Sequence, residues 1–307
     1  MKKEIVDNIN GYLMSGTDIF IESRNSPLFN VPKIGIGNKT IDNGNYLFKK
    51  EEMLEFIKQE PGSKKFFKPW YGTKEIVCRK PRYCLFLGNV KYDSYKNMPK
   101  VLELVNNVME YRKLSSKKNT RELAYKPTTF EKTKLQPVDY WVIPGLVPSD
   151  RTYLTLFFLS KEYLTSASMY VIDDCKLYHF GILSSDIHMK WVRIFCGRLG
   201  NQIRYSASVV YNNFPWPVLN SEQKREIEEA AQNILNIREK YKNKSYAYLY
   251  NPETMPGDLK AAHEQNDKVV KEAYGINEKA TDEEIIGKLI YLYIKRVREL
   301  DEKRNSK

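Results

Sequence analysis

The first part of the chain alternates short apolar runs with helical patterns. The runs at 18–22 and 83–87 are rich in β-forming residues and are bounded by glycine, proline or charged residues, so they predict strands. Residues 49–59 predict a helix that ends before Pro61, because proline disfavours helical geometry in the residue ahead of it. A longer helix is expected over 98–114, where apolar residues recur at three- and four-residue steps.

The middle of the chain has the pattern of a small sheet. Strands are expected at 140–144, 153–158 and 167–172, and the segments between them carry turn-forming residues. Strands joined by such short turns favour an antiparallel sheet. Residues 176–199 then change to helical spacing, which predicts a helix that packs on the sheet. Five side chains share one face of this helix: His188, Trp191, Val192, Phe195 and Leu199.

Helical patterns with a 3.6-residue period fill the chain after the sequence FPWP at 214–217. Three helices are expected there, over 221–244, 259–274 and 282–300. Ser221 is a plausible N-cap of the first, and Thr281 and Glu284 have the spacing of a capping box at the start of the last. The predicted fold class is therefore α+β: an antiparallel sheet with packed helices, followed by a small all-α bundle.

The composition is that of a folded protein. The 307 residues are 42% apolar and 13% aromatic, which suits about two domains of ~100–200 residues. The sequence has no run of about 18 apolar residues and no apolar stretch of a secretory signal, so we expect a cytoplasmic protein without a membrane segment. Its cysteines and histidines are scattered and include no CxxC pair, which gives no indication of a metal site or a disulfide framework.

The positive charge is concentrated in the first two thirds of the chain. Lys and Arg exceed Asp and Glu by 50 − 38 = 12, whereas residues 218–307 hold 17 basic and 17 acidic side chains. All of the excess therefore falls in residues 1–217. A basic segment joined to a neutral one indicates that the first part faces a polyanion. The alternative is a generally basic proteome of a lysine-rich organism.

Motifs of several enzyme classes are absent from the sequence. An adenine methyltransferase needs a glycine-rich cofactor loop and a polar-Pro-Pro-aromatic motif for the flipped base. This chain has no Pro-Pro pair, and Gly35-Ile-Gly37 lacks a third glycine and a following helix. Glu75, Lys80 and Asp139 do not have the order and spacing of a nuclease site. We therefore expect no catalytic, cofactor-binding or metal-binding residue in this chain.

The densest set of side chains suited to nucleic acid lies in residues 191–217. Arg193, Arg198 and Arg204 can bind phosphates or a guanine edge, and the amides of Asn201 and Gln202 can pair with adenine. Hydroxyls that can bond to backbone oxygens follow at Tyr205, Ser206 and Ser208. The alternative is a helix that ends at Gly200 and continues into an ordinary strand and turn, and the residues alone leave both open.

A second basic stretch interleaves cations with aromatic side chains, a mix that suits a phosphate backbone. Its candidate DNA-backbone contacts are Lys64, Lys65, Lys68, Arg79 and Arg82. The nearby Phe66, Phe67 and Trp70 are expected to be core residues. Arg24 is either a phosphate contact or a partner for Glu22.

Several long runs carry a family resemblance. ESRNSPLFNVPKIGIGNKTIDNGNYLF, FFKPWYG, VPSDRTYLTLFFL and above all HMKWVRIFCGRLGNQIRYSASVVYNNFPWP resemble the region after the methyltransferase domain in MmeI-type restriction-modification enzymes. LYNPETMPGDLKAAHEQNDKVVKEAYG is similar to the helical tail of that family. The resemblance implies a connector helix at 1–14, a target-recognition domain at 15–217 and a C-terminal helical domain at 218–307.

The resemblance also implies a function. In that family a nuclease and an N6-adenine methyltransferase precede the recognition domain, so the expected partners are double-stranded DNA and a methyltransferase domain or subunit that binds S-adenosylmethionine. The family's base-reading positions imply six candidates: Leu199, Gly200, Asn201, Gln202, Ile203 and Arg204. The alternatives are that the chain is itself a site-specific adenine methyltransferase, or an adaptor that does not bind DNA.

Overall fold

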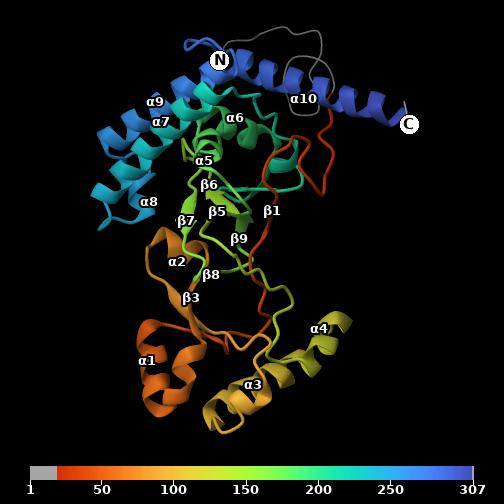
Figure 1. Ribbon diagram of the computed structural model, residues 1–307, viewed down its shortest axis with the longest axis vertical. Helices are drawn as coiled ribbons and strands as arrows, with labels where there is room; N and C mark the ends of the chain where they lie inside the picture. The colour runs from red at the N-terminus through yellow and green to blue at the C-terminus, as the bar shows by residue number, and fades with distance from the viewer. Residues whose placement is uncertain (1–18, 306–307) are drawn as a thin grey trace.

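The computed structural model describes residues 19–305, and the predicted connector helix at 1–14 lies outside them. The molecule is elongated, with a layer of helices at one end, a sheet in the middle and a smaller lobe at the other end (Figure 1). In the described part of the chain, no helix has the length and apolar character needed to cross a membrane.

The central sheet has the strand order β1-β9-β5-β7 and is antiparallel throughout. Its strands are β1 (Ile34–Ile36), β5 (Tyr140–Pro144), β7 (Phe157–Leu159) and β9 (Met169–Ile172). Because side chains alternate across a strand, Trp141 and Ile143 join the large core beneath the helices, whereas Val142 joins a smaller core on the other face. Both faces of β5 are therefore buried, and the predicted antiparallel sheet is confirmed.

The helical layer covers one face of this sheet (Figure 1). It comprises α5 (Leu177–Leu183), α6 (Asp186–Phe195), α7 (Ser221–Lys240), α8 (Tyr246–Leu249), α9 (Gly257–Ala273) and α10 (Asp282–Asn305). One hydrophobic core runs from the sheet through α6 into α7, α9 and α10, with Trp191 and Leu289 fully enclosed. The division of the chain into domains at 217 stays a prediction.

The smaller lobe is built around a second sheet of order β2-β4-β3-β8. Its elements are β2 (Leu47–Phe48), β3 (Phe67–Tyr71), β4 (Arg82–Leu85), β8 (Leu164–Thr165), α1 (Lys50–Gln59), α2 (Thr73–Val77), α3 (Pro99–Lys113) and α4 (Lys118–Glu122). Phe66 and Trp70 are buried and Phe67 packs against the same core, which confirms their structural role. The buried Arg112 donates hydrogen bonds to five backbone carbonyls and so ties α3 to the loops around it. Short 3₁₀ turns lie at Pro61–Phe66, Tyr92–Ser94, Leu123–Tyr125 and Tyr211–Asn213.

Several predictions of single elements were wrong. Residues 19–22 are not a strand, and residue 18 lies outside the described part. The strand expected at 153–158 begins only at Phe157. The single helix expected over 176–199 is two helices, because Ser185 caps α6 by accepting a hydrogen bond from the His188 amide, and residues 197–199 form a strand.

Helix starts in the C-terminal part follow their capping chemistry. Asn220, rather than Ser221, caps α7: its Oδ1 accepts a hydrogen bond from the Gln223 amide at 2.8 Å. The predicted capping box at α10 is confirmed, because Thr281 and Glu284 each accept a hydrogen bond from the other's amide.

Candidate nucleic-acid interface

The residues singled out at 197–204 form a β-hairpin, which we call the reading hairpin. Its strands are β10 (Gly197–Leu199) and β11 (Gln202–Arg204), and β11 also pairs with β6 (Leu146–Pro148). Leu199 pairs with Gln202, so the turn consists of Gly200 and Asn201 alone. Gly200 has a φ of 55°, a conformation that glycine adopts without steric cost.

The hairpin has two faces: Leu199, Gln202 and Arg204 share one, and Arg198 is opposite Ile203 on the other. Arg198, Leu199, Asn201 and Arg204 are exposed and Gln202 is half-buried. Ile203, in contrast, is fully buried in the large core, where it pairs with Val147 of β6. The structure therefore corrects the expectation for Ile203: its side chain anchors the hairpin and is not accessible to a base.

Residues that follow the hairpin are tied into the protein. The Tyr205 side chain is buried, with its hydroxyl 3.1 Å from Nε2 of His188, so it is not accessible to a DNA backbone. Ser206 and Ser208 are half-buried, and the Ser206 hydroxyl accepts a hydrogen bond from the Val209 amide. At these three positions the geometry favours the structural interpretation that the sequence left open.

Two of the candidate arginines also have internal partners. Nη2 of Arg193 donates to the carbonyl of Arg151 at 2.8 Å. Arg24 donates to Asn213 at 2.9 Å and lies 3.7 Å from Glu22, the partner that one of its two alternatives named. Both arginines therefore hold chain segments together, whereas Arg198 and Arg204 of the hairpin remain exposed.

The candidates of the second basic stretch are spread over the smaller lobe. Lys64 and Lys65 are exposed in the 3₁₀ turn before β3. Lys68 lies 3.7 Å from Glu162, and Nε of Arg82 lies 2.9 Å from Glu75. Arg79 packs over the ring of Tyr246 in α8, with 4.1 Å between the guanidinium carbon and the ring centroid.

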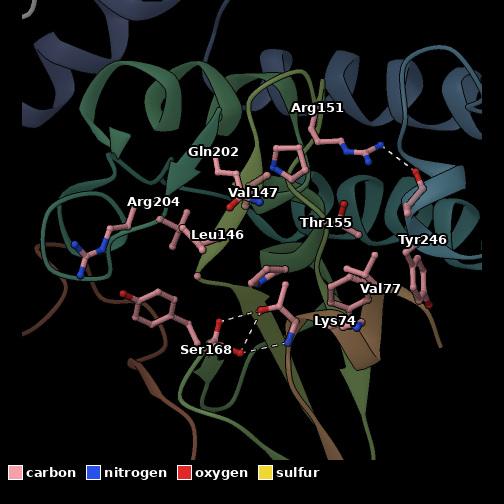
Figure 2. A pocket seen from close by; sticks show the side chains of 18 of the residues that line it. Lys74, Val77, Leu146, Val147, Arg151, Thr155, Ser168, Gln202, Arg204 and Tyr246 are labelled. Carbon is pink, nitrogen blue, oxygen red and sulfur yellow. Dashed lines mark hydrogen bonds between the residues drawn. The ribbon is translucent and has the colours of Figure 1, made fainter. Parts of the chain in front are cut away.

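A cleft of about 930 Å³ opens beside the reading hairpin. Figure 2 shows Gln202 and Arg204 on one side of it, Ser168 and Lys74 across from them, and Arg151 and Tyr246 toward the helical layer. Thr73 connects the segments of Lys74 and Ser168, because its hydroxyl donates a hydrogen bond to the carbonyl of Ser168 at 3.2 Å.

The charged side chains that line the cleft are basic. Lys74, Arg151 and Arg204 line it, and no aspartate or glutamate of residues 19–305 does. Thr73, Lys74 and Ser168 could not be proposed from the sequence, because they lie on segments that only the tertiary structure brings together. Such a surface attracts polyanions and presents hydrogen-bond donors to acceptor atoms.

None of the three histidines lines the cleft. His179, His188 and His263 are all buried, and burial lowers the pKa of His188 to about 3. All four cysteines are free, with Cys84 and Cys196 buried. Among residues 19–305 no group of three or more His, Cys, Asp and Glu residues is arranged to hold a metal ion.

Comparisons with known proteins agree with this geometry. The model of the MmeI target recognition domain matches residues 15–218, and that of the MmeI C-terminal domain matches residues 218–301. DNA methyltransferase A of Bacillus subtilis (strain 168) is 38% identical over 291 residues, which are 95% of this chain and 33% of that protein. The chain thus spans about a third of this curated relative.

A solved structure extends the comparison to three dimensions. The Type IIL restriction-modification enzyme MmeI in complex with DNA superposes with a TM-score of 0.92 at 38% identity, over 95% of this chain and 39% of that chain. The fold is thereby confirmed as mixed α and antiparallel β with a helical C-terminal region. The chain belongs to the MmeI family and comprises its target recognition domain and its C-terminal domain.

Proposed function

We propose that this chain recognises a specific sequence in double-stranded DNA on behalf of an adenine methyltransferase of a restriction-modification system. The observation that carries the proposal is the reading hairpin, which presents exposed polar side chains beside a cleft whose charged lining, within residues 19–305, is basic. The family membership and the DNA complex of the MmeI relative support it.

The hairpin carries side chains whose chemistry suits a major-groove reader. A major groove about 12 Å wide admits a two-stranded β-ribbon. The Gln202 and Asn201 amides match the edge of adenine, the Arg204 guanidinium matches the edge of guanine, and the exposed Leu199 can contact a thymine methyl group. Arg198 on the neighbouring strand would contact a phosphate.

Methyl transfer belongs, in this proposal, to another part of the system. The methyl donor S-adenosylmethionine would bind to a methyltransferase domain or subunit, as the name of the B. subtilis relative suggests. This chain would bring that domain to its target and so take part in defence against foreign DNA. It would do so in the cytoplasm, where both the chromosome and incoming DNA are found.

Selection of bound duplexes from a random pool tests the proposal. The full chain is incubated with the pool, and bound duplexes are sequenced with and without the cognate methyltransferase. We expect enrichment of one short motif and an affinity that falls steeply with salt, because phosphate neutralisation releases counterions. Absence of any salt-dependent binding would contradict the proposal and favour an adaptor that only contacts proteins.

A further inference from the structure

A second groove continues the cleft along the smaller lobe. It has a volume of about 1150 Å³ and shares Thr73, Lys74, Cys78 and Ser168 with the cleft. Two of its lining residues are acidic, Glu51 and Glu75, and six are basic: Lys49, Lys50, Lys74, Arg79, Lys80 and Arg82. We call it the basic groove.

Most of the positive charge in the basic groove is not neutralised by the protein. Glu75 is engaged by Arg82 at 2.9 Å and also accepts a hydrogen bond from the Gly72 amide at 2.9 Å. Lys74 and Lys80 are exposed, and neither forms an ion pair within residues 19–305. The groove therefore offers free ammonium groups to a ligand of opposite charge.

Arg79 occupies a backbone position that would suit glycine. It follows α2 with a φ of 55°. The Lys80 amide donates to the carbonyl of Glu75 at 2.9 Å, which is the hydrogen bond that closes a helix C-terminal motif. In that motif, glycine usually occupies the position that Arg79 has here. Nε and Nη2 of Arg79 are buried without a hydrogen-bond acceptor. The chain thus has an arginine at this position although its backbone is left-handed and two of its side-chain nitrogens are buried without an acceptor.

We propose that the basic groove binds backbone phosphates of the DNA whose bases the reading hairpin contacts. This inference rests on the proposed function. An element inserted into a major groove is flanked by two phosphate strands about 12 Å apart, so cations are needed beside the reading element as well as on it. Lys74 lines both the cleft and the basic groove, whereas Lys80 and Arg79 line the basic groove alone.

Salt-dependent binding to a duplex of mixed sequence provides the test. The double variant Lys74→Ala/Lys80→Ala removes two groove cations. Lys260→Ala/Lys268→Ala removes two exposed lysines of α9, which pair with Glu264 and Glu278, as a control of equal charge change. Because each phosphate contact contributes about 0.9 to the slope of log K against log salt, we expect the groove variant to lower that slope by about two. The control is expected to keep the wild-type slope.

Arg79→Gly gives a second, independent readout. Glycine accepts the left-handed backbone without strain, so this variant is expected to fold, whereas its DNA affinity falls and its sequence preference stays the same. Equal salt slopes for the groove and control variants, with wild-type binding intact, would overturn the groove assignment and leave the proposed function standing. Failure of the wild-type chain to bind any duplex would overturn both.

Discussion

The hydroxyl of Tyr205 lies 3.1 Å from Nε2 of His188, in the core directly behind the strand that ends at Arg204. Both side chains are fully buried, and burial holds the pKa of His188 low enough to keep its ring neutral. The contact therefore fixes the end of the reading hairpin from the inside.

Replacing Tyr205 with Phe tests this internal role. The variant leaves a buried histidine nitrogen without its partner, so we expect a loss of about 1–3 kcal/mol in the free energy of unfolding. Urea titration measures the loss, and the exposed Tyr125→Phe serves as a control with no expected change. The enriched DNA motif should stay the same, and a changed motif would show that Tyr205 itself contacts DNA.

The two aliphatic side chains of the hairpin should behave in opposite ways. Ile203 is fully buried whereas Leu199 is 58% exposed. Ile203→Ala leaves a cavity and is expected to cost about 2–5 kcal/mol in the free energy of unfolding, whereas Leu199→Ala should change it by less than about 0.5 kcal/mol. Similar losses in denaturant titrations of both variants would contradict the two-faced hairpin.

The buried histidines make stability depend on pH. Burial lowers the pKa of His179 to about 4 and that of His188 to about 3, and it also lowers the pKa of His263. An unfolded histidine titrates near 6.5, so the unfolded chain binds more protons below that pH. We expect the unfolding free energy to have its highest value above about pH 6.5 and to fall as the pH drops toward 4. A free energy that stays constant over this range would contradict the buried, neutral histidines.

Asp267 makes stability depend on pH in the opposite direction. Burial raises the pKa of its carboxyl to about 7, although Tyr153 and the Asp186 amide both donate hydrogen bonds to it. Because the pKa is raised in the folded state, the carboxyl contributes its full stabilisation below its unfolded pKa near 3.9. This stabilisation is lost as the pH rises through 7. Asp267→Asn should therefore gain stability relative to the wild type between pH 5 and pH 8. Denaturant titrations at both pH values measure the difference, and a constant difference would argue against a protonated carboxyl.

Local periodicity predicted most of the helices but not where helices break. The bounds of α1, α3 and α9 follow from apolar spacing to within one or two residues. The break between α5 and α6 has no such signal, because apolar residues continue on both sides of it. The break depends on Ser185, whose hydroxyl donates to the Ile182 carbonyl and accepts from the His188 amide.

Some residues of the candidate site could be predicted from the sequence and others could not. The reading hairpin is one continuous segment, so its residues could be proposed from the sequence. Lys74 and Ser168 could not, because the parallel pairing of Trp70 with Leu164 brings their segments together across a long separation in the chain. Burial of Ile203 follows from the pairing of β11 with β6, which the sequence did not predict.

Recovery of the bound motif with an Arg204→Ala variant tests the central claim most directly. If Arg204 reads a guanine, the variant should lose about 1–3 kcal/mol on the wild-type site and accept other bases at one position of the motif, while the remaining positions stay fixed. An unchanged motif, with a uniform loss of affinity for all sequences, would contradict base reading by the hairpin.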